Sequence, residues 1–81
     1  MTLFPQVMIN VEVKEKPEIE SVPEIGRIIK QVEKKLEDKG RVLVRYSGTE
    51  PVCRVMVEGE DRKIIQHYAE EIAKIIEKHL G

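Results

Sequence analysis

Residues 45–51, with the sequence RYSGTEP, bring together in one short stretch several groups that bind oxyanions. Arg45 carries planar, bidentate donors, and the side chains of Ser47 and Thr49 each carry a hydroxyl group. Gly48 has no Cβ, so the backbone can turn sharply and neighbouring amides can converge on an anion. The residue types of this loop therefore predict an anion site whose ligands are Arg45, Ser47, Gly48 and Thr49.

Two charged residues and one alternative interpretation bear on this prediction. Arg54 follows the loop and adds a second guanidinium if the strand register directs it to the same side. Glu50 would repel a phosphate, so we expect its side chain to point elsewhere or to pair with an arginine. The alternative is an ordinary hairpin tip, because Ser, Gly, Thr and Pro are also the residues of tight turns. The loop lacks the lysine and glycine spacing of a P-loop, and the anion site and the plain turn both stay open.

Other reactive side chains do not form a recognisable site. Ser47 would need a neighbouring base to act as a nucleophile, and no pattern places His67 or His79 beside it, so a phosphate-binding hydroxyl is favoured. The two histidines have no cysteine or paired carboxylate at metal-ligand spacing, so no metal site is expected. Cys53 lies in an alternating apolar run and is expected to be a buried hydrophobic residue. We therefore predict no catalytic residue in this chain.

Alternation with a period of two predicts the strands that position the loop. The first strand lies near the N-terminus, and its apolar residues are Val7, Ile9, Val11 and Val13. Residues 42–44 and 52–57 are two further β-rich runs. Because turn residues separate these two runs, they are expected to form a hairpin with a polar tip. The loop therefore connects two paired strands.

Two stretches have the spacing of amphipathic helices. In the first, Ser21 and Glu24 match a capping box, and Gly40 is the expected stop in the left-handed conformation. In the second, Asp61 is the expected N-cap. The apolar stripes consist of Ile25, Ile28, Ile29, Val32 and Leu36 in the first helix, and of Ile64, Ile65, Tyr68, Ala69, Ile72, Ile75 and Ile76 in the second.

The order strand, helix, strand, strand, helix predicts an α+β fold. Two helices with one apolar stripe each need one apolar sheet face to pack on. We therefore expect a two-layer sandwich in which a small, mostly antiparallel sheet carries both helices on one face. At 81 residues the chain is expected to be a single domain, residues 1–81, with a modest core and room only for a shallow site.

Composition argues against several classes of partner. The formal net charge is −1 although 36% of the residues are charged, so no global field attracts nucleic acid or an anionic membrane. Aromatic residues make up only 4%, too few for a base-stacking surface. No apolar stretch is long enough to span a bilayer, and no signal peptide is recognisable. With a single cysteine and hence no internal disulfide, the cytoplasm is the expected compartment.

The loop also carries a resemblance to a known family. RYSGTEP at residues 45–51, continued by RVMVEG at residues 54–59, closely resembles the phosphate-binding loop and following strand of the α-D-phosphohexomutases. Within that superfamily, Gly48, residues 54–59 and the opening FPQV at residues 4–7 with INV at 9–11 are similar to the phosphoglucosamine mutases. The resemblance therefore runs across nearly the whole chain.

This resemblance implies the fourth, C-terminal domain of such an enzyme, with a fold like that of the TATA-binding protein. In the family, the loop grips the non-reacting phosphate of a phosphosugar. The residues at the matching positions here are Arg45, Ser47, Gly48, Thr49 and Arg54. Tyr46 stands where relatives vary, and we assign it no role.

The resemblance further implies an enzyme that interconverts glucosamine 6-phosphate and glucosamine 1-phosphate. Its partners would be the phosphosugar and the other domains of the same chain. Magnesium and a phosphoserine would lie in those other domains, so this domain would hold no cofactor and would not be active alone. The alternatives are a phosphomannomutase or phosphoglucomutase domain, a free-standing anion-binding module, and an interaction domain in which an internal carboxylate engages Arg45.

Overall fold

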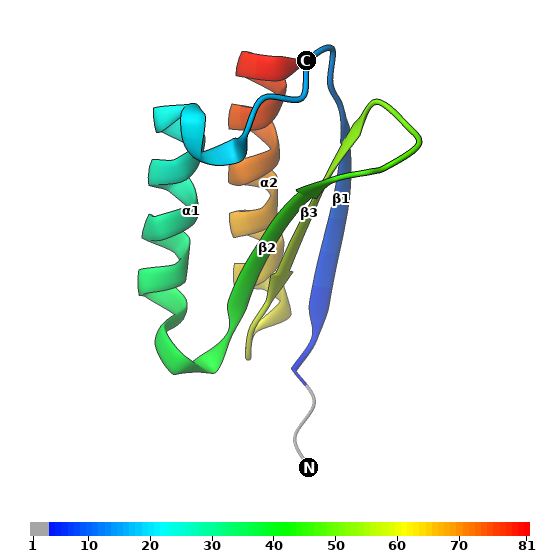
Figure 1. Ribbon diagram of the computed structural model, residues 1–81. Coiled ribbons are helices and arrows are strands. Elements are labelled where there is room, and N and C mark those ends of the chain that lie inside the picture. Colours follow the sequence, from blue (N-terminus) through cyan, green and yellow to red (C-terminus); the bar gives the residue numbers. More distant parts are fainter. Residues whose placement is uncertain (1–3) are drawn as a thin grey trace.

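The computed structural model describes residues 4–81, with Asp38 described by its backbone only. A three-stranded sheet carries two α-helices on one of its faces (Figure 1). The strands are β1 (Gln6–Glu12), β2 (Arg41–Tyr46) and β3 (Val52–Glu58), and the helices are α1 (Pro23–Leu36) and α2 (Arg62–Leu80). Short 3₁₀ turns, η1 (Ile19–Ser21) and η2 (Glu37–Lys39), flank α1. This arrangement confirms the predicted α+β two-layer sandwich.

The central strand of the sheet is β3. The strand order is β1-β3-β2, and β3 runs antiparallel to both neighbours. β2 and β3 form the predicted hairpin, whereas β1 reaches its partner only after the chain has passed through α1. Figure 1 shows that the hairpin tip and the connector after β1 lie at the same end of the sheet as the C-terminus of α2.

One face of the sheet and the facing helix stripes form the core. Alternate residues of each strand point to this face, as the period of two predicted. The buried side chains of the sheet are Val7, Val11, Cys53, Val55 and Val57, and those of the helices include Ile25, Val32, Ile65, Ile72 and Ile76. Burying a side chain of this size contributes about 1.5–3 kcal/mol, so these contacts stabilise the register of the strands.

The two helices begin in different ways. The Asp61 carboxylate accepts hydrogen bonds from the amides of Lys63 (2.9 Å) and Ile64 (3.3 Å), which confirms it as the N-cap of α2. The capping box predicted for α1 is wrong, because the Ser21 hydroxyl donates to the Glu18 carbonyl (2.7 Å) within the preceding 3₁₀ turn. Neither described helix has the length and apolarity that crossing a membrane requires.

Gly40 does not have the predicted role of a left-handed helix stop. α1 ends at Leu36, and the residue with positive φ is Glu37 (φ 53°), whereas Gly40 is fully extended (φ 177°). A glycine is still required at position 40 by packing, because an added Cβ would collide with the backbone carbonyl oxygen of Glu58 on β3. The chain thus passes close against β3 as it enters β2.

We predict that Gly40→Ala lowers the free energy of unfolding by about 1–3 kcal/mol, because the new methyl group has no space beside the rigid strand β3. Gly26→Ala is the matched control. Gly26 lies inside α1 with nothing within 4 Å of an added Cβ, so alanine there should stabilise the protein by about 0.5–1 kcal/mol. Chemical denaturation of both variants measures these changes. Equal effects of the two substitutions would contradict the close approach at position 40.

An ion pair joins the two helices at one end of the molecule. His79 Nε2 in the last turn of α2 lies 2.8 Å from Glu24 Oε2 in the first turn of α1. The hydrogen bond from His79, together with the charge of that ring, holds the pKa of Glu24 below its ordinary value. Glu24 therefore stabilises the fold above the ordinary carboxyl pKa and loses this contribution as the pH falls through its lowered pKa.

We predict that Glu24→Gln lowers stability at pH 6 and that the difference from the wild type shrinks as the pH approaches 3. Glutamine cannot carry the charge that this contribution needs. Glu33→Gln, at another exposed position of α1, is the control and should show a smaller dependence on pH. Thermal unfolding across this pH range is the measurement. A constant difference between Glu24→Gln and wild type at all pH values would refute the ion pair.

Candidate functional site

The sheet face opposite the helices carries a row of polar side chains across all three strands. Asn10 of β1 pairs with Arg54 of β3, and Arg54 pairs in turn with Arg45 of β2. Because the partners of an antiparallel ladder point to the same face, Arg54 and Arg45 stand directly opposite each other. The register, which the sequence did not determine, therefore directs Arg54 to the same side as Arg45. The next row along the sheet is apolar and consists of Met8, Met56 and Leu43.

A hollow of 370 Å³ lies where these two rows meet the hairpin loop. It is lined by Met8, Leu43, Arg45, Tyr46, Ser47, Gly48, Arg54 and Met56. Four of the five predicted site residues therefore come together here, and their role as ligands stays a prediction. Thr49 does not line the hollow. The hollow is open to solvent, as expected for a domain of this size, since Met8 remains 58% exposed.

Hydrogen bonds around Ser47 shape the loop. The Ser47 amide donates to the carbonyl of Val52 (2.8 Å), which closes the hairpin. The amide nitrogens of Thr49 and Glu50 both lie 3.4 Å from Ser47 Oγ. Two backbone donors thus converge on one oxygen atom, although both hydrogen bonds are long and therefore weak. These two amides are directed at an oxygen of the chain itself, and the convergence of amides on an anion stays a prediction.

Gly48 is not held in a conformation that only glycine adopts. The backbone bends at residues 48–51, as expected, but the φ of Gly48 is not positive, so this bend does not need a conformation that favours glycine. An added Cβ would also meet nothing within 4 Å. Neither the backbone nor the packing of the described residues therefore demands glycine at position 48.

The two arginines of the row form no ion pair within the described part of the chain. Ion pairs among the described residues are Arg41–Glu58, His67–Glu71 and His79–Glu24. Arg45 and Arg54 take part in none of them, and Glu50 neither lines the hollow nor pairs with an arginine. The interaction-domain alternative required an internal carboxylate at Arg45, and no described residue provides it. Like charges directly opposite each other destabilise a sheet, so this arrangement is unfavourable without an external anion.

Sequence reasoning missed two residues that hold the loop in place. Lys16 Nζ donates to the Ser47 carbonyl (3.1 Å), and the Tyr46 hydroxyl donates to the Pro17 carbonyl (2.5 Å). Burial raises the pKa of Tyr46, which keeps the hydroxyl protonated as a donor. Both contacts join the connector after β1 to the end of β2. Nothing in the sequence of the charged connector indicated these two hydrogen bonds.

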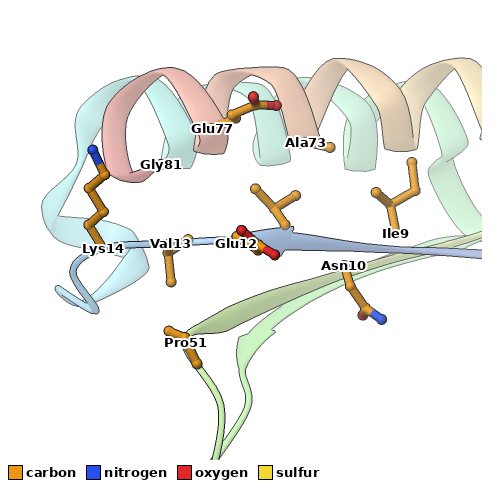
Figure 2. A pocket seen from close by; sticks show the side chains of 10 residues that line it. Ile9, Asn10, Glu12, Val13, Lys14, Pro51, Ala73, Glu77 and Gly81 are labelled. Atoms are coloured by element: carbon orange, nitrogen blue, oxygen red, sulfur yellow. The ribbon is translucent and has the colours of Figure 1, made fainter.

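A larger hollow of 590 Å³ lies between β1 and the last turns of α2, and its chemistry differs (Figure 2). Its charged residues are Glu12, Lys14 and Glu77. Two carboxylates against one ammonium disfavour an anion. In Figure 2, Ile9 points to the helix and Asn10 points away from it, toward the face that carries the arginines. The smaller hollow is therefore the better candidate for phosphate.

The remaining reactive side chains lie in the core or on α2. Cys53 is fully buried, and burial raises the pKa of its thiol, which confirms the prediction of a buried hydrophobic residue. His67 pairs with Glu71 and His79 with Glu24, and both histidines belong to α2. Among the described residues, neither histidine forms a hydrogen bond with Ser47. No cluster of three metal-ligating side chains occurs among the described residues.

Comparison with known protein families identifies the chain. Residues 8–75 match the family described as the C-terminal domain of phosphoglucomutase/phosphomannomutase. The chain belongs to this family. Over all 81 residues this phosphohexomutase domain is 58% identical to a phosphoglucosamine mutase of Syntrophotalea carbinolica and 51% identical to one of Geobacter metallireducens. The domain spans only 18% of the length of each of these relatives.

Solved structures with the same architecture come from larger proteins. N-acetylphosphoglucosamine mutase of Aspergillus fumigatus, in complex with GlcNAc-6P and magnesium, superposes on 96% of the phosphohexomutase domain with a TM-score of 0.79 and 26% identity. A serine-to-alanine variant of that enzyme, in complex with glucose 1,6-bisphosphate, covers 94% of the domain with a TM-score of 0.79 and 28% identity. In both cases the domain corresponds to 16% of the larger chain.

We predict that Arg54→Gln stabilises the ligand-free domain by about 0.2–1 kcal/mol, because it removes the repulsion from Arg45. The gain should shrink between about 20 mM and 1 M salt, as screening weakens the same repulsion in the wild type. Arg41→Gln is the control on the same sheet face. Arg41 Nε donates to Glu58 Oε2 (3.0 Å), so its loss should not stabilise the domain. Denaturation at both salt concentrations measures the effect, and a destabilised Arg54→Gln at low salt would count against the repulsion.

Proposed function

We propose that this domain grips the non-reacting phosphate of a phosphosugar in a phosphoglucosamine mutase. The ligands are Arg45, Ser47, Gly48, Thr49 and Arg54. The observation that carries the proposal is the pair of arginines standing opposite each other on an open sheet face, neither of them in an ion pair among the described residues. A phosphate dianion between them replaces repulsion by two charge-assisted contacts.

The chemistry of the site suits phosphate. Guanidinium groups donate in a planar fork that matches phosphate oxygens, and each charge-assisted hydrogen bond contributes about 1.5–3 kcal/mol. The loop adds the Ser47 hydroxyl and the two amides that converge on Ser47 Oγ, whose long hydrogen bonds can be exchanged for a phosphate oxygen. The open space around Gly48 allows a ligand to approach the backbone closely.

The relatives support the assignment of a substrate class. Both bacterial relatives are phosphoglucosamine mutases, and they match over the whole of the domain. The Aspergillus fumigatus enzyme was solved with GlcNAc-6P. A phosphomannomutase or phosphoglucomutase is the second candidate, since the family description covers both of these activities. Identity to the phosphoglucosamine mutases favours glucosamine phosphate over the second candidate.

The role of the domain in the proposed reaction is to hold and orient. A mutase that interconverts glucosamine 6-phosphate and glucosamine 1-phosphate must bind a phosphate at either end of the sugar. A site that recognises the phosphate itself tolerates both orientations. Fixing one phosphate positions the hydroxyl at the other end for phosphoryl transfer. Magnesium and the phosphoserine belong to the other domains of the proposed enzyme. This domain therefore binds the phosphosugar but does not catalyse the phosphoryl transfer.

We predict that inorganic phosphate and glucosamine 6-phosphate shift the amide NMR signals of residues 45–50, with a dissociation constant of about a millimolar or weaker, because a shallow loop alone must offset the ordering costs. Arg45→Gln should weaken binding by about tenfold or more, which corresponds to the loss of one charge-assisted hydrogen bond. Arg41→Gln, whose guanidinium is paired with Glu58, should bind as the wild type does.

An absence of saturable shifts at tens of millimolar ligand would overturn phosphate binding by this domain. Equal losses in Arg45→Gln and Arg41→Gln would show that only general charge attracts the ligand. Comparing glucosamine 6-phosphate with mannose 6-phosphate in the same titration tests whether the domain itself contributes to sugar choice. Since the ligands proposed here contact only the phosphate, the two sugars should bind equally.

A further inference from the structure

The connector between β1 and α1 holds the loop at both of its ends. At the beginning of the loop, Lys16 Nζ donates to the Ser47 carbonyl (3.1 Å), and next to it the Tyr46 hydroxyl donates to Pro17. At the end of the loop, the Val13 amide donates to the Pro51 carbonyl (2.8 Å). Figure 1 shows the connector passing beside the hairpin at this end of the sheet. The position of the loop thus depends on a segment far away in the sequence.

The ammonium of Lys16 is directed to a backbone carbonyl although carboxylates are near. Lys16, Glu18 and Glu20 line the same small surface depression, together with Arg45. Among the described residues, however, no ion pair joins Lys16 to either glutamate. Its hydrogen bond goes to Ser47, whose own amide and hydroxyl already shape the loop.

A hydrogen bond to the Ser47 carbonyl also acts on the next amide. The carbonyl of Ser47 and the N–H of Gly48 belong to one planar trans peptide unit, so they point in opposite directions. Gly48 lines the hollow beside Arg45 and Arg54, whereas Lys16 does not line it. Holding the carbonyl on the connector side therefore turns the Gly48 N–H away from the connector. A cation at the carbonyl also polarises the peptide and strengthens its N–H as a donor.

We propose that Lys16 is a positioning residue of the anion site, which, through the Ser47 carbonyl, holds the Gly48 amide as a donor to the bound phosphate. This inference rests on the proposed phosphate binding by the loop. It assigns to Lys16 a role that requires no direct contact with the ligand. It also explains why a lysine in an exposed connector is tied to the backbone of the hairpin.

The test compares three variants of the domain by amide NMR and titration with inorganic phosphate. Lys16→Met removes the donor and keeps the length of the side chain, Lys16→Arg restores a cationic donor, and Lys30→Met removes an exposed charge from α1 as the control. Thermal unfolding shows that each variant is folded. Titrations are carried out at low salt and at about 0.5 M salt, where remote charges are largely screened.

We expect Lys16→Met to shift the amide signals of Ser47 and Gly48 already without phosphate. Its phosphate affinity should fall by about three- to tenfold, as expected for the loss of one hydrogen bond, and the loss should persist at high salt. Lys16→Arg should recover most of the affinity, and Lys30→Met should change neither the signals nor the affinity.

Any of the following results would overturn the inference. An affinity loss that disappears at high salt, or that Lys30→Met shares, would show that Lys16 acts only through the long-range attraction of its charge. Unchanged signals of Ser47 and Gly48 in ligand-free Lys16→Met would show that the tie does not position the loop. If the wild type binds phosphate and Lys16→Met binds it equally well, the inference alone fails. If the wild type does not bind phosphate at all, the proposed function fails, and the inference fails as well because it rests on that function.

Discussion

The register of β3 between its two neighbours is the constraint on which both the core and the site depend. Side chains alternate along a strand, so a slip by one residue would exchange the two faces of the sheet. Arg54 would then enter the core, and the fully buried Cys53 and Val55 would face solvent. Burial of these apolar residues therefore fixes the position of Arg54 opposite Arg45. The same alternation that builds the core directs both guanidinium groups to the open face.

The energies explain how the domain sustains an unfavourable pair of charges. Two like charges opposite each other in a sheet are unfavourable by about 0.2–1 kcal/mol. Burial of Val55 or Val57 contributes about 1.5–3 kcal/mol each, so the register holds in spite of the repulsion. Arg41, two rows further from the loop, has Glu58 as its counterion and shows that the same face can neutralise an arginine. Local conflicts of this kind within a consistent fold are typical of functional sites.

The strands and helices could be predicted from the sequence because they depend on local periodicity. Prediction failed where segments that are distant in the sequence meet. Alternation in β1 and the apolar stripes of α1 and α2 required only a few neighbouring residues. The roles of Ser21 and Gly40 were predicted wrongly, because a 3₁₀ turn and the approach of β3 decide them. Lys16 and Tyr46 were missed since their partners lie 31 and 29 positions away. The side to which Arg54 points depended on a pairing register that local patterns do not contain.

The anchoring of the connector bears on the phosphate binding that we propose for the loop. A flexible loop must be ordered on binding, and this ordering reduces the affinity. Here the connector holds both ends of the loop, and the Lys14 amide donates to the Leu80 carbonyl (2.6 Å), which fastens the connector to the end of α2. The His79–Glu24 pair joins that end of α2 to α1. The loop is therefore attached to both layers of the domain. In the proposed binding of phosphate, only the weak hydrogen bonds to Ser47 Oγ would then have to be exchanged.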